Sequence, residues 1–122
     1  MTGQGEFEAA ADHFGRSARL AASIGDVHCQ AQAIAGLGTV HAARGSLAEA
    51  ISELRRGLRS LPTSEATALR APVLEKLADV LSDSGDHEGA RHYWAEALEA
   101  YTSMNDPRVE RIRTRIRSTR PE

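Results

Sequence analysis

A repeat of 40 residues constrains the fold of this chain more than any other feature of its sequence. Residues of similar kind recur at this spacing in three sets: Gly5, Gly45 and Gly85; Ala10, Ala50 and Ala90; and Phe14, Leu54 and Trp94. A strict period of this length is typical of an array of supersecondary units. The sequence therefore predicts a repetitive architecture rather than one irregular domain.

The apolar residues of each unit recur at helical spacing, as Ala50, Leu54 and Leu58 do, and no segment shows the alternation of a strand. We therefore expect an all-α chain of six helices. Its expected organisation is a single domain, 1–122, which divides into a half repeat at 5–24, repeats at 27–62 and 64–103, and a last helix at 106–118.

Residues typical of helix ends and helix caps separate the predicted helices. Gly25 suits the left-handed position after a helix, and the Asp26 carboxylate can cap the helix that follows. Gly85 and Asp86 repeat this pair, and the sequence at 105–107, Asn-Asp-Pro, is a further start signal. Helix boundaries are therefore expected near these positions.

Two other boundary signals concern the third and fourth helices. Ser46 and Glu49 have the spacing of a capping box, so a third helix should start at Leu47. Thr63 or Ser64 can cap the next helix. Pro72 lies inside that helix and should kink or restart it, because its ring clashes with the carbonyl four residues earlier.

Composition narrows the class of protein. The chain has 122 residues, 41% hydrophobic and 26% charged, which is ordinary for a globular domain. Its net charge of −2 gives no general attraction to nucleic acid or to anionic membranes. A single cysteine, Cys29, excludes an intrachain disulfide and cysteine-based metal motifs. No apolar run is long enough to span a membrane, and no signal peptide is evident, so a cytoplasmic location is expected.

The residues of each unit resemble the pattern of the tetratricopeptide repeat. The middle unit carries it at Leu37, Gly38, His41, Gly45, Ala50, Leu54, Gly57 and Pro62. The third unit carries it at Leu77, Ala78, Leu81, Gly85, Ala90, Trp94 and Ala97. The first unit keeps only its second helix. The period of 40 exceeds the family's usual 34, which is similar to the longer repeats of bacterial transcriptional regulators.

This resemblance implies a tetratricopeptide-like α-solenoid of about two and a half helix-turn-helix repeats. Small residues such as Ala50 and Ala90 would lie where helices cross closely. The last helix, 106–118, departs from the pattern because Arg117 stands where an apolar residue would continue it. It therefore resembles the capping helix of such arrays, with a polar outer face.

The resemblance also implies a module that binds a peptide or protein segment on its concave face, without catalysis, cofactor or metal. The positions that face the ligand in this family hold Gln32, Ala35, Thr39 and Ala43 on one helix and Glu75, Asp79 and Asp83 on another. Small side chains on the first helix leave room for a bound backbone. The acids are four residues apart and share a helix face. They form either a solvated acidic face or a wall that favours a segment carrying Arg or Lys.

Other candidate sites have weaker signals. The histidines, at positions 13, 28, 41, 87 and 92, lack the spacing of metal ligands. The arginine-rich segment 108–120 fits a solvated cap, a protein-docking surface or, less well in an acidic chain, a nucleic-acid contact. The absent first helix of the half repeat should expose an apolar edge around Phe7, which predicts self-association or docking there.

Two functions remain open from the sequence. The first is a protein-interaction scaffold, either free-standing or part of a bacterial regulator. The second is a regulatory domain of a transcription factor that senses a ligand or a signal peptide. Neither identifies the partner.

Overall fold

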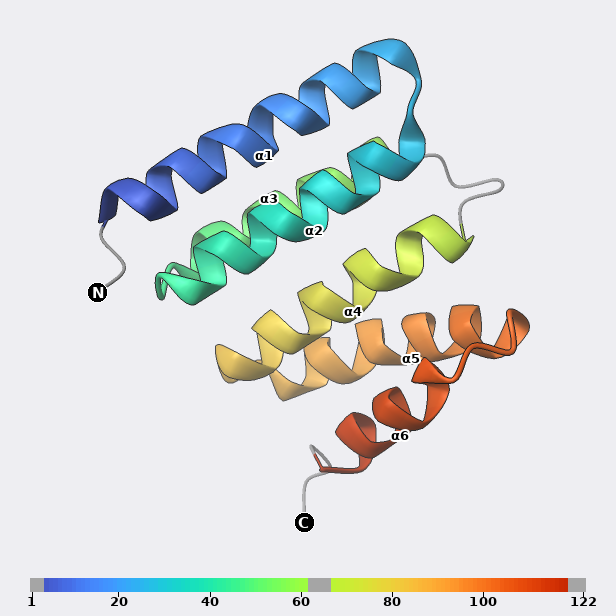
Figure 1. The fold of residues 1–122 in the computed structure, drawn as a ribbon. Coiled ribbons are helices and arrows are strands. Elements are labelled where there is room, and N and C mark those ends of the chain that lie inside the picture. Colours follow the sequence, from blue (N-terminus) through green and yellow to red (C-terminus); the bar gives the residue numbers. More distant parts are fainter. Residues whose placement is uncertain (1–3, 62–66, 119–122) are drawn as a thin grey trace.

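A computed structural model describes residues 4–61 and 67–118 of the chain (Figure 1). The helices are α1 (Gln4–Ile24), α2 (Val27–Ala43), α3 (Leu47–Ser60), α4 (Thr67–Asp83), α5 (His87–Ser103) and α6 (Arg108–Ser118). No strand occurs within the described ranges, so the all-α prediction is confirmed. The proposed caps Thr63 and Ser64 lie outside the described residues.

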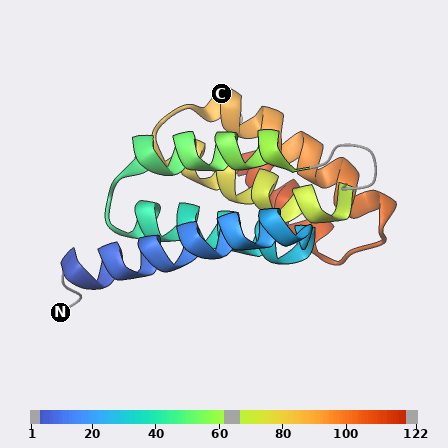
Figure 2. The same cartoon turned by 90° about the horizontal axis from the view of Figure 1, so that it is seen from above.

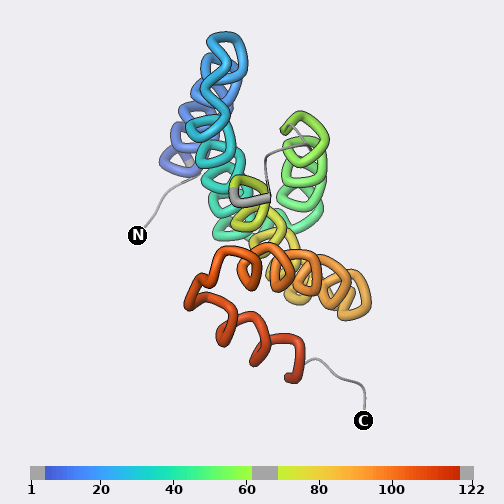
Figure 3. Tube along the Cα trace, turned by 90° about the vertical axis from the view of Figure 1, so that its right-hand side faces the viewer, coloured from blue at the N-terminus to red at the C-terminus, as the bar shows by residue number. Residues whose placement is uncertain are grey.

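The helices pack against one another in chain order (Figures 1 and 2), and α2 also packs against α4. Figure 3 shows α2 and α4 next to each other, with α3 displaced to one side of them. The first helices of the two repeats are therefore neighbours, and the second helices, α3 and α5, lie outside this pair. This is the arrangement of a helical repeat array.

The predicted turn signals are confirmed at three helix ends. The glycines there adopt left-handed backbone angles: Gly25 with φ 76°, Gly45 with φ 83° and Gly85 with φ 96°. Residues with a Cβ are strained at such angles. Asp26 accepts a hydrogen bond from the backbone N–H of Cys29 at 3.1 Å, and Asp86 accepts one from Gly89 at 2.9 Å. These caps satisfy N–H groups that the helix leaves unpaired.

Two local predictions need correction. Ser46 is at the N-cap of α3, but its side chain makes no capping hydrogen bond. The Ser46 N–H, which Glu49 would accept from in a capping box, donates instead to the His41 carbonyl oxygen at 2.9 Å, so the box is not formed. Of the two outcomes predicted at Pro72, a restart is wrong, because α4 runs as one helix from Thr67 to Asp83, and a kink stays a prediction. Burial of the residues that follow Pro72 outweighs its local penalty, as tertiary packing commonly does.

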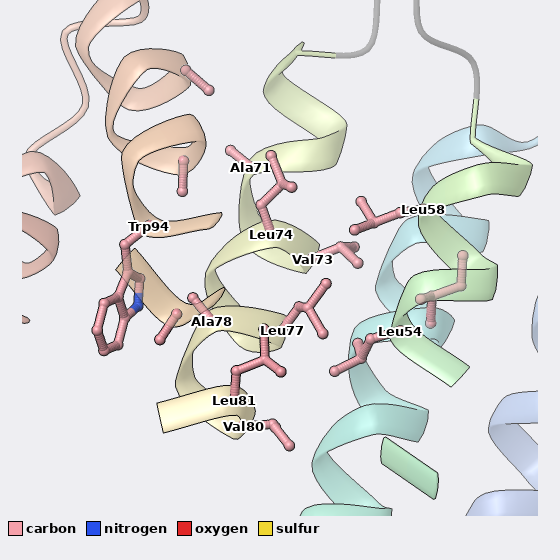
Figure 4. Packing of buried hydrophobic residues seen from close by; sticks show 14 of the residues in the cluster. Leu54, Leu58, Ala71, Val73, Leu74, Leu77, Ala78, Val80, Leu81 and Trp94 are labelled. Atoms are coloured by element: carbon pink, nitrogen blue, oxygen red, sulfur yellow. The ribbon is translucent and has the colours of Figure 1, made fainter. Parts of the chain in front are cut away.

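The core is centred on α4 (Figure 4). Its buried side chains are Ala71, Val73, Leu74, Leu77, Ala78, Val80 and Leu81. Leu54 and Leu58 of α3 lie on one side of this helix and Trp94 of α5 on the other. Because α4 has packed neighbours on both sides, it is the best-supported element of the array.

Small residues allow the helices to approach closely. Ala50 and Ala90 are fully buried, at equivalent positions of the two repeats. A Cβ added at Gly38 would lie 2.6 Å from the Leu54 side chain, and one added at Gly57 would collide with Ile34. These contacts are tighter than van der Waals packing permits. Even a methyl group at either glycine would therefore force the facing side chain, or the helix that carries it, to shift.

Candidate functional site

Glu75 of α4 is buried within a network of side chains from α5 and α6. Its side chain is 9% exposed. Tyr101 Oη of α5 donates a hydrogen bond of 3.0 Å to Glu75 Oε1. Arg111 and Arg115 of α6 lie 2.7 Å and 2.6 Å from Glu75 Oε2. Arg108 lies over the ring of Tyr101, 4.4 Å from its centroid, and closes the same cluster.

Asp79 extends the network by one helical turn. Its Oδ1 atom accepts a hydrogen bond of 3.0 Å from Trp94 Nε1 of α5. Arg115 Nη1 also lies 3.0 Å from Asp79 Oδ1, so this guanidinium bridges both carboxylates of α4. Trp94 and Tyr101 thus bury their rings in the core while their polar atoms contact the acids of α4.

Burial and hydrogen bonding act in opposite directions on the two carboxylates. Burial favours the neutral form of Glu75, but hydrogen bonds from Arg111 and Tyr101 and the nearby charges outweigh it, so its pKa is lowered. Burial is the largest effect at Asp79, and the negative charge of Glu75 adds to it. The pKa of Asp79 is therefore raised despite the hydrogen bond from Trp94 and the charge of Arg115. Burial and the Glu75 charge also raise the pKa of Tyr101.

The acidic stripe predicted on α4 therefore does not form an open wall. Glu75 and Asp79 contact arginines of the chain's own last helix, and only Asp83 is exposed. The sequence pattern of the stripe did not indicate Arg111 and Arg115 as their partners. The repeat itself contained the signal, since Arg115 lies one period of 40 residues after Glu75. The long side chains of Arg111 and Arg115 reach Glu75 from α6, which itself packs against α5.

The predicted groove residues of α2 have different surroundings. Gln32, Thr39 and Ala43 are exposed and Ala35 is half-buried. Thr39 Oγ1 donates a hydrogen bond of 2.9 Å to the Ala35 carbonyl oxygen within the helix. These positions carry no charge, and their surface is left open at Gln32, Thr39 and Ala43.

A hollow of about 350 Å³ lies between α2 and α4, and we call it the α2–α4 hollow. Its lining residues are His28, Ala31, Gln32, Ala35, Leu69 and Pro72. Two of the seven predicted groove residues, Gln32 and Ala35, thus meet at one cavity. The lining is mainly apolar, with one amide and one imidazole as polar groups, which is the usual character of a small binding pocket.

The other sequence candidates are placed as follows. Phe7 is half-buried, whereas Leu20 and Ile24 near the end of α1 are 64% and 69% exposed. In the arginine-rich segment, Arg108 pairs with Asp106 and Arg113 with Glu110. Within the described residues no group of acidic, histidine or cysteine side chains has a metal-binding arrangement, and no helix is long and apolar enough to cross a membrane.

Comparison with known families is consistent with this architecture. Residues 73–107 match the family model of the tetratricopeptide repeat. The matched segment covers most of α4, all of α5 and the turn before α6. No curated protein matches the sequence. The helical repeat is of the kind that mediates protein–protein interactions. Residues 73–107 therefore carry a tetratricopeptide repeat, within a chain whose described residues fold as an all-α array of helices.

Proposed function

We propose that the chain is a protein-interaction module that binds a peptide segment of a partner across α2 and α4. The observation that carries this proposal is the α2–α4 hollow, which lies between the first helices of the two repeats. Gln32 and Ala35 line it, and Thr39 and Ala43 continue along α2. The bound segment would therefore lie along α2.

The chemistry of the lining indicates the kind of segment. Ala31, Ala35, Leu69 and Pro72 provide an apolar floor that suits a small or medium apolar side chain. The Gln32 amide can donate to and accept from the backbone of an extended peptide. A preference for basic segments receives little support here, because the carboxylates of Glu75 and Asp79 already contact arginines.

The experiment is a selection of peptides from a random display library, followed by NMR mapping of the selected peptides on the labelled protein. We expect amide shifts at Gln32, Ala35 and Leu69. The variant Ala35→Leu places a larger side chain in the hollow and should weaken binding strongly. Ala95→Leu is the matched control, because Ala95 is exposed on α5, away from the hollow. Equal binding by both variants, or shifts confined to another face, would overturn the proposal.

A further inference from the structure

A second hollow, of about 380 Å³, lies between α3, the start of α4 and α5. Its walls come mainly from the second helices of the two repeats, so it is separate from the α2–α4 hollow. Its polar lining consists of Arg55 and Arg59 from α3, Arg70 from α4, and His92, Tyr93 and Glu96 from α5. We call it the arginine hollow.

The arginines are arranged to face the same space. Arg55 and Arg59 are four residues apart, so they project from one face of α3. Arg70 comes from α4, and its Nη1 atom donates a hydrogen bond of 2.9 Å to the Leu58 carbonyl oxygen. This bond fixes the Arg70 side chain beside the end of α3. Three guanidinium groups from two helices therefore border one cavity.

These charges are poorly neutralised within the described part of the chain. Arg55 and Arg59 have no carboxylate partner there, whereas their neighbour Arg56 pairs with Glu53. Glu96 is the one acid in the lining, and it contacts His92 Nε2 at 3.1 Å on its own helix. The cavity thus keeps an excess of positive charge.

A hydrogen-bond donor adds to this charge. Tyr93 is half-buried in the wall, and its hydroxyl has no hydrogen-bond partner among the described residues. Helix stability explains only part of the cluster. Arg59 in the last turn of α3, and Arg70 through its hydrogen bond to the Leu58 carbonyl oxygen, can interact favourably with the carbonyls at that helix end, but Arg55 lies further back.

We propose that the arginine hollow binds a carboxylate or phosphate group carried by an acidic segment of a partner protein. Planar guanidinium groups form paired, charge-assisted hydrogen bonds with such oxyanions. The volume is near the lower end of ligand pockets, which span roughly 300–1,000 Å³, so it suits one or two acidic side chains. The inference does not rest on peptide binding at the α2–α4 hollow.

The test uses inorganic phosphate and three hexapeptides that differ only at two central residues: Glu-Glu, phosphoserine-Glu, or Gln-Gln. Binding is followed by NMR, including the side-chain Nε–Hε signals of the arginines. We expect the Glu-Glu and phosphoserine peptides to shift the Arg55 and Arg59 signals and the Gln-Gln peptide to shift neither. The stronger of the first two identifies carboxylate or phosphate as the preferred group.

Matched variants localise the site. The double variant Arg55→Gln, Arg59→Gln should bind the acidic peptides about tenfold more weakly, because two charge-assisted contacts are lost at partly solvated positions. Arg56→Gln removes one arginine from the same helix outside this hollow and should bind like the parent. All the variants should melt like the parent, since Arg55 and Arg59 are exposed and Arg56 makes only an exposed pair.

Several results would overturn the inference. One is equal binding of the acidic peptides by the double variant and the parent. Another is an equal loss of affinity in Arg56→Gln, which would indicate a diffuse charge effect. Binding of the Gln-Gln peptide as tightly as the acidic peptides would also contradict it. So would binding of inorganic phosphate by a protein that binds neither acidic peptide. Affinity should fall as salt is raised, because exposed charges are screened over about 8 Å at physiological ionic strength.

Discussion

The two first helices of the array, α2 and α4, have equivalent residues at one period of 40 but different surroundings. The equivalent pairs are Ala35 with Glu75, Thr39 with Asp79, and Ala43 with Asp83. Ala35 borders an open hollow between α2 and α4. Glu75 and Asp79 contact arginines of α6. The position of a residue in the repeat therefore determines which way its side chain points. The helix whose side chains face that position determines whether it stays open to a ligand.

The difference follows from the composition of the neighbouring helix. The start of α4 offers Leu69 and Pro72 to α2, and these side chains form no specific polar contact with Ala35. The inner face of α6 offers Arg111 and Arg115 to α4. The contact between α2 and α4 is apolar and leaves a hollow, whereas the contact between α4 and α6 is polar and pairs the carboxylates with arginines. We therefore expect ligand binding at the first and structural support from the second.

The strongest test of this difference is removal of the Glu75 carboxylate. Glu75→Ala should lower the free energy of unfolding by about 2–4 kcal/mol, because the buried Tyr101 hydroxyl and two arginines lose an acceptor. The side chains of Arg111 and Arg115 are 49% and 34% exposed, which keeps the loss below that of a fully buried pair. Urea denaturation gives the measurement.

Asp83→Ala is the control for that experiment. Asp83 occupies the same stripe but is exposed, so its removal should change stability by less than about 0.5 kcal/mol. Equal losses of unfolding free energy in Glu75→Ala and Asp83→Ala would mean that the contacts of Glu75 with α6 contribute little to stability.

The repeats should behave alike at their helix crossings. Ala50→Leu and Ala90→Leu each insert a larger side chain at a fully buried position, and each should cost about 1–3 kcal/mol through overpacking. Thermal melting of both variants checks this. Ala48→Leu is the control, since Ala48 is exposed on α3 and should tolerate the change. A large effect in only one of the two repeats would show that their crossings are not equivalent.

Protonation of Glu75 should weaken the same contacts more gently than its removal. Its pKa is lower in the folded chain than the ordinary value of 4.5. Its stabilising contribution is therefore present above that value and is lost as the pH falls through the folded-state pKa. The free energy of unfolding should consequently fall more steeply between about pH 5 and pH 3 in the parent than in Glu75→Gln.

Asp79 acts in the opposite sense over a similar range. Its raised pKa means that its contribution is greatest when it is protonated and is lost as the pH rises above 3.8. Glu75→Gln also removes the negative charge that helps to raise the pKa of Asp79, so the comparison of the parent with this variant reports Glu75 together with its effect on Asp79. The free energy of unfolding of both proteins is measured by urea denaturation at a series of pH values. An equal fall in both proteins at acid pH would contradict the assigned role of Glu75.

The helical architecture was largely predictable because its signals are local. Gly45 and Asp86 act within one turn of the chain, and the burial of Ala50 and Ala90 follows from their common phase in the repeat. The failed capping box shows the limit of such reasoning. Glu49 has the right spacing, but the Ser46 N–H already donates to the His41 carbonyl oxygen, a contact that the spacing does not reveal.

The site was less predictable because its partners are distant in sequence. The contact of Glu75 with Arg115 spans 40 residues, and that of Asp79 with Trp94 spans 15. An acidic stripe indicates a helix face but not what covers it. The hollow at Gln32 and Ala35 likewise depends on Leu69 and Pro72, which approach only when α2 and α4 pack together.

The smallest expected effects test the comparison at one pair of equivalent positions. Thr39→Ala should leave stability unchanged or raise it by up to about 0.5 kcal/mol, because the exposed hydroxyl only bonds to the Ala35 carbonyl and alanine favours the helix. Asp79→Ala should cost about 1 kcal/mol, because Trp94 and Arg115 lose an acceptor. The raised pKa of Asp79 limits that cost, since burial already disfavours its charge. Urea denaturation measures the free energy of unfolding of both variants. The same change in both would show that the exposed position on α2 and the covered position on α4 contribute alike to stability.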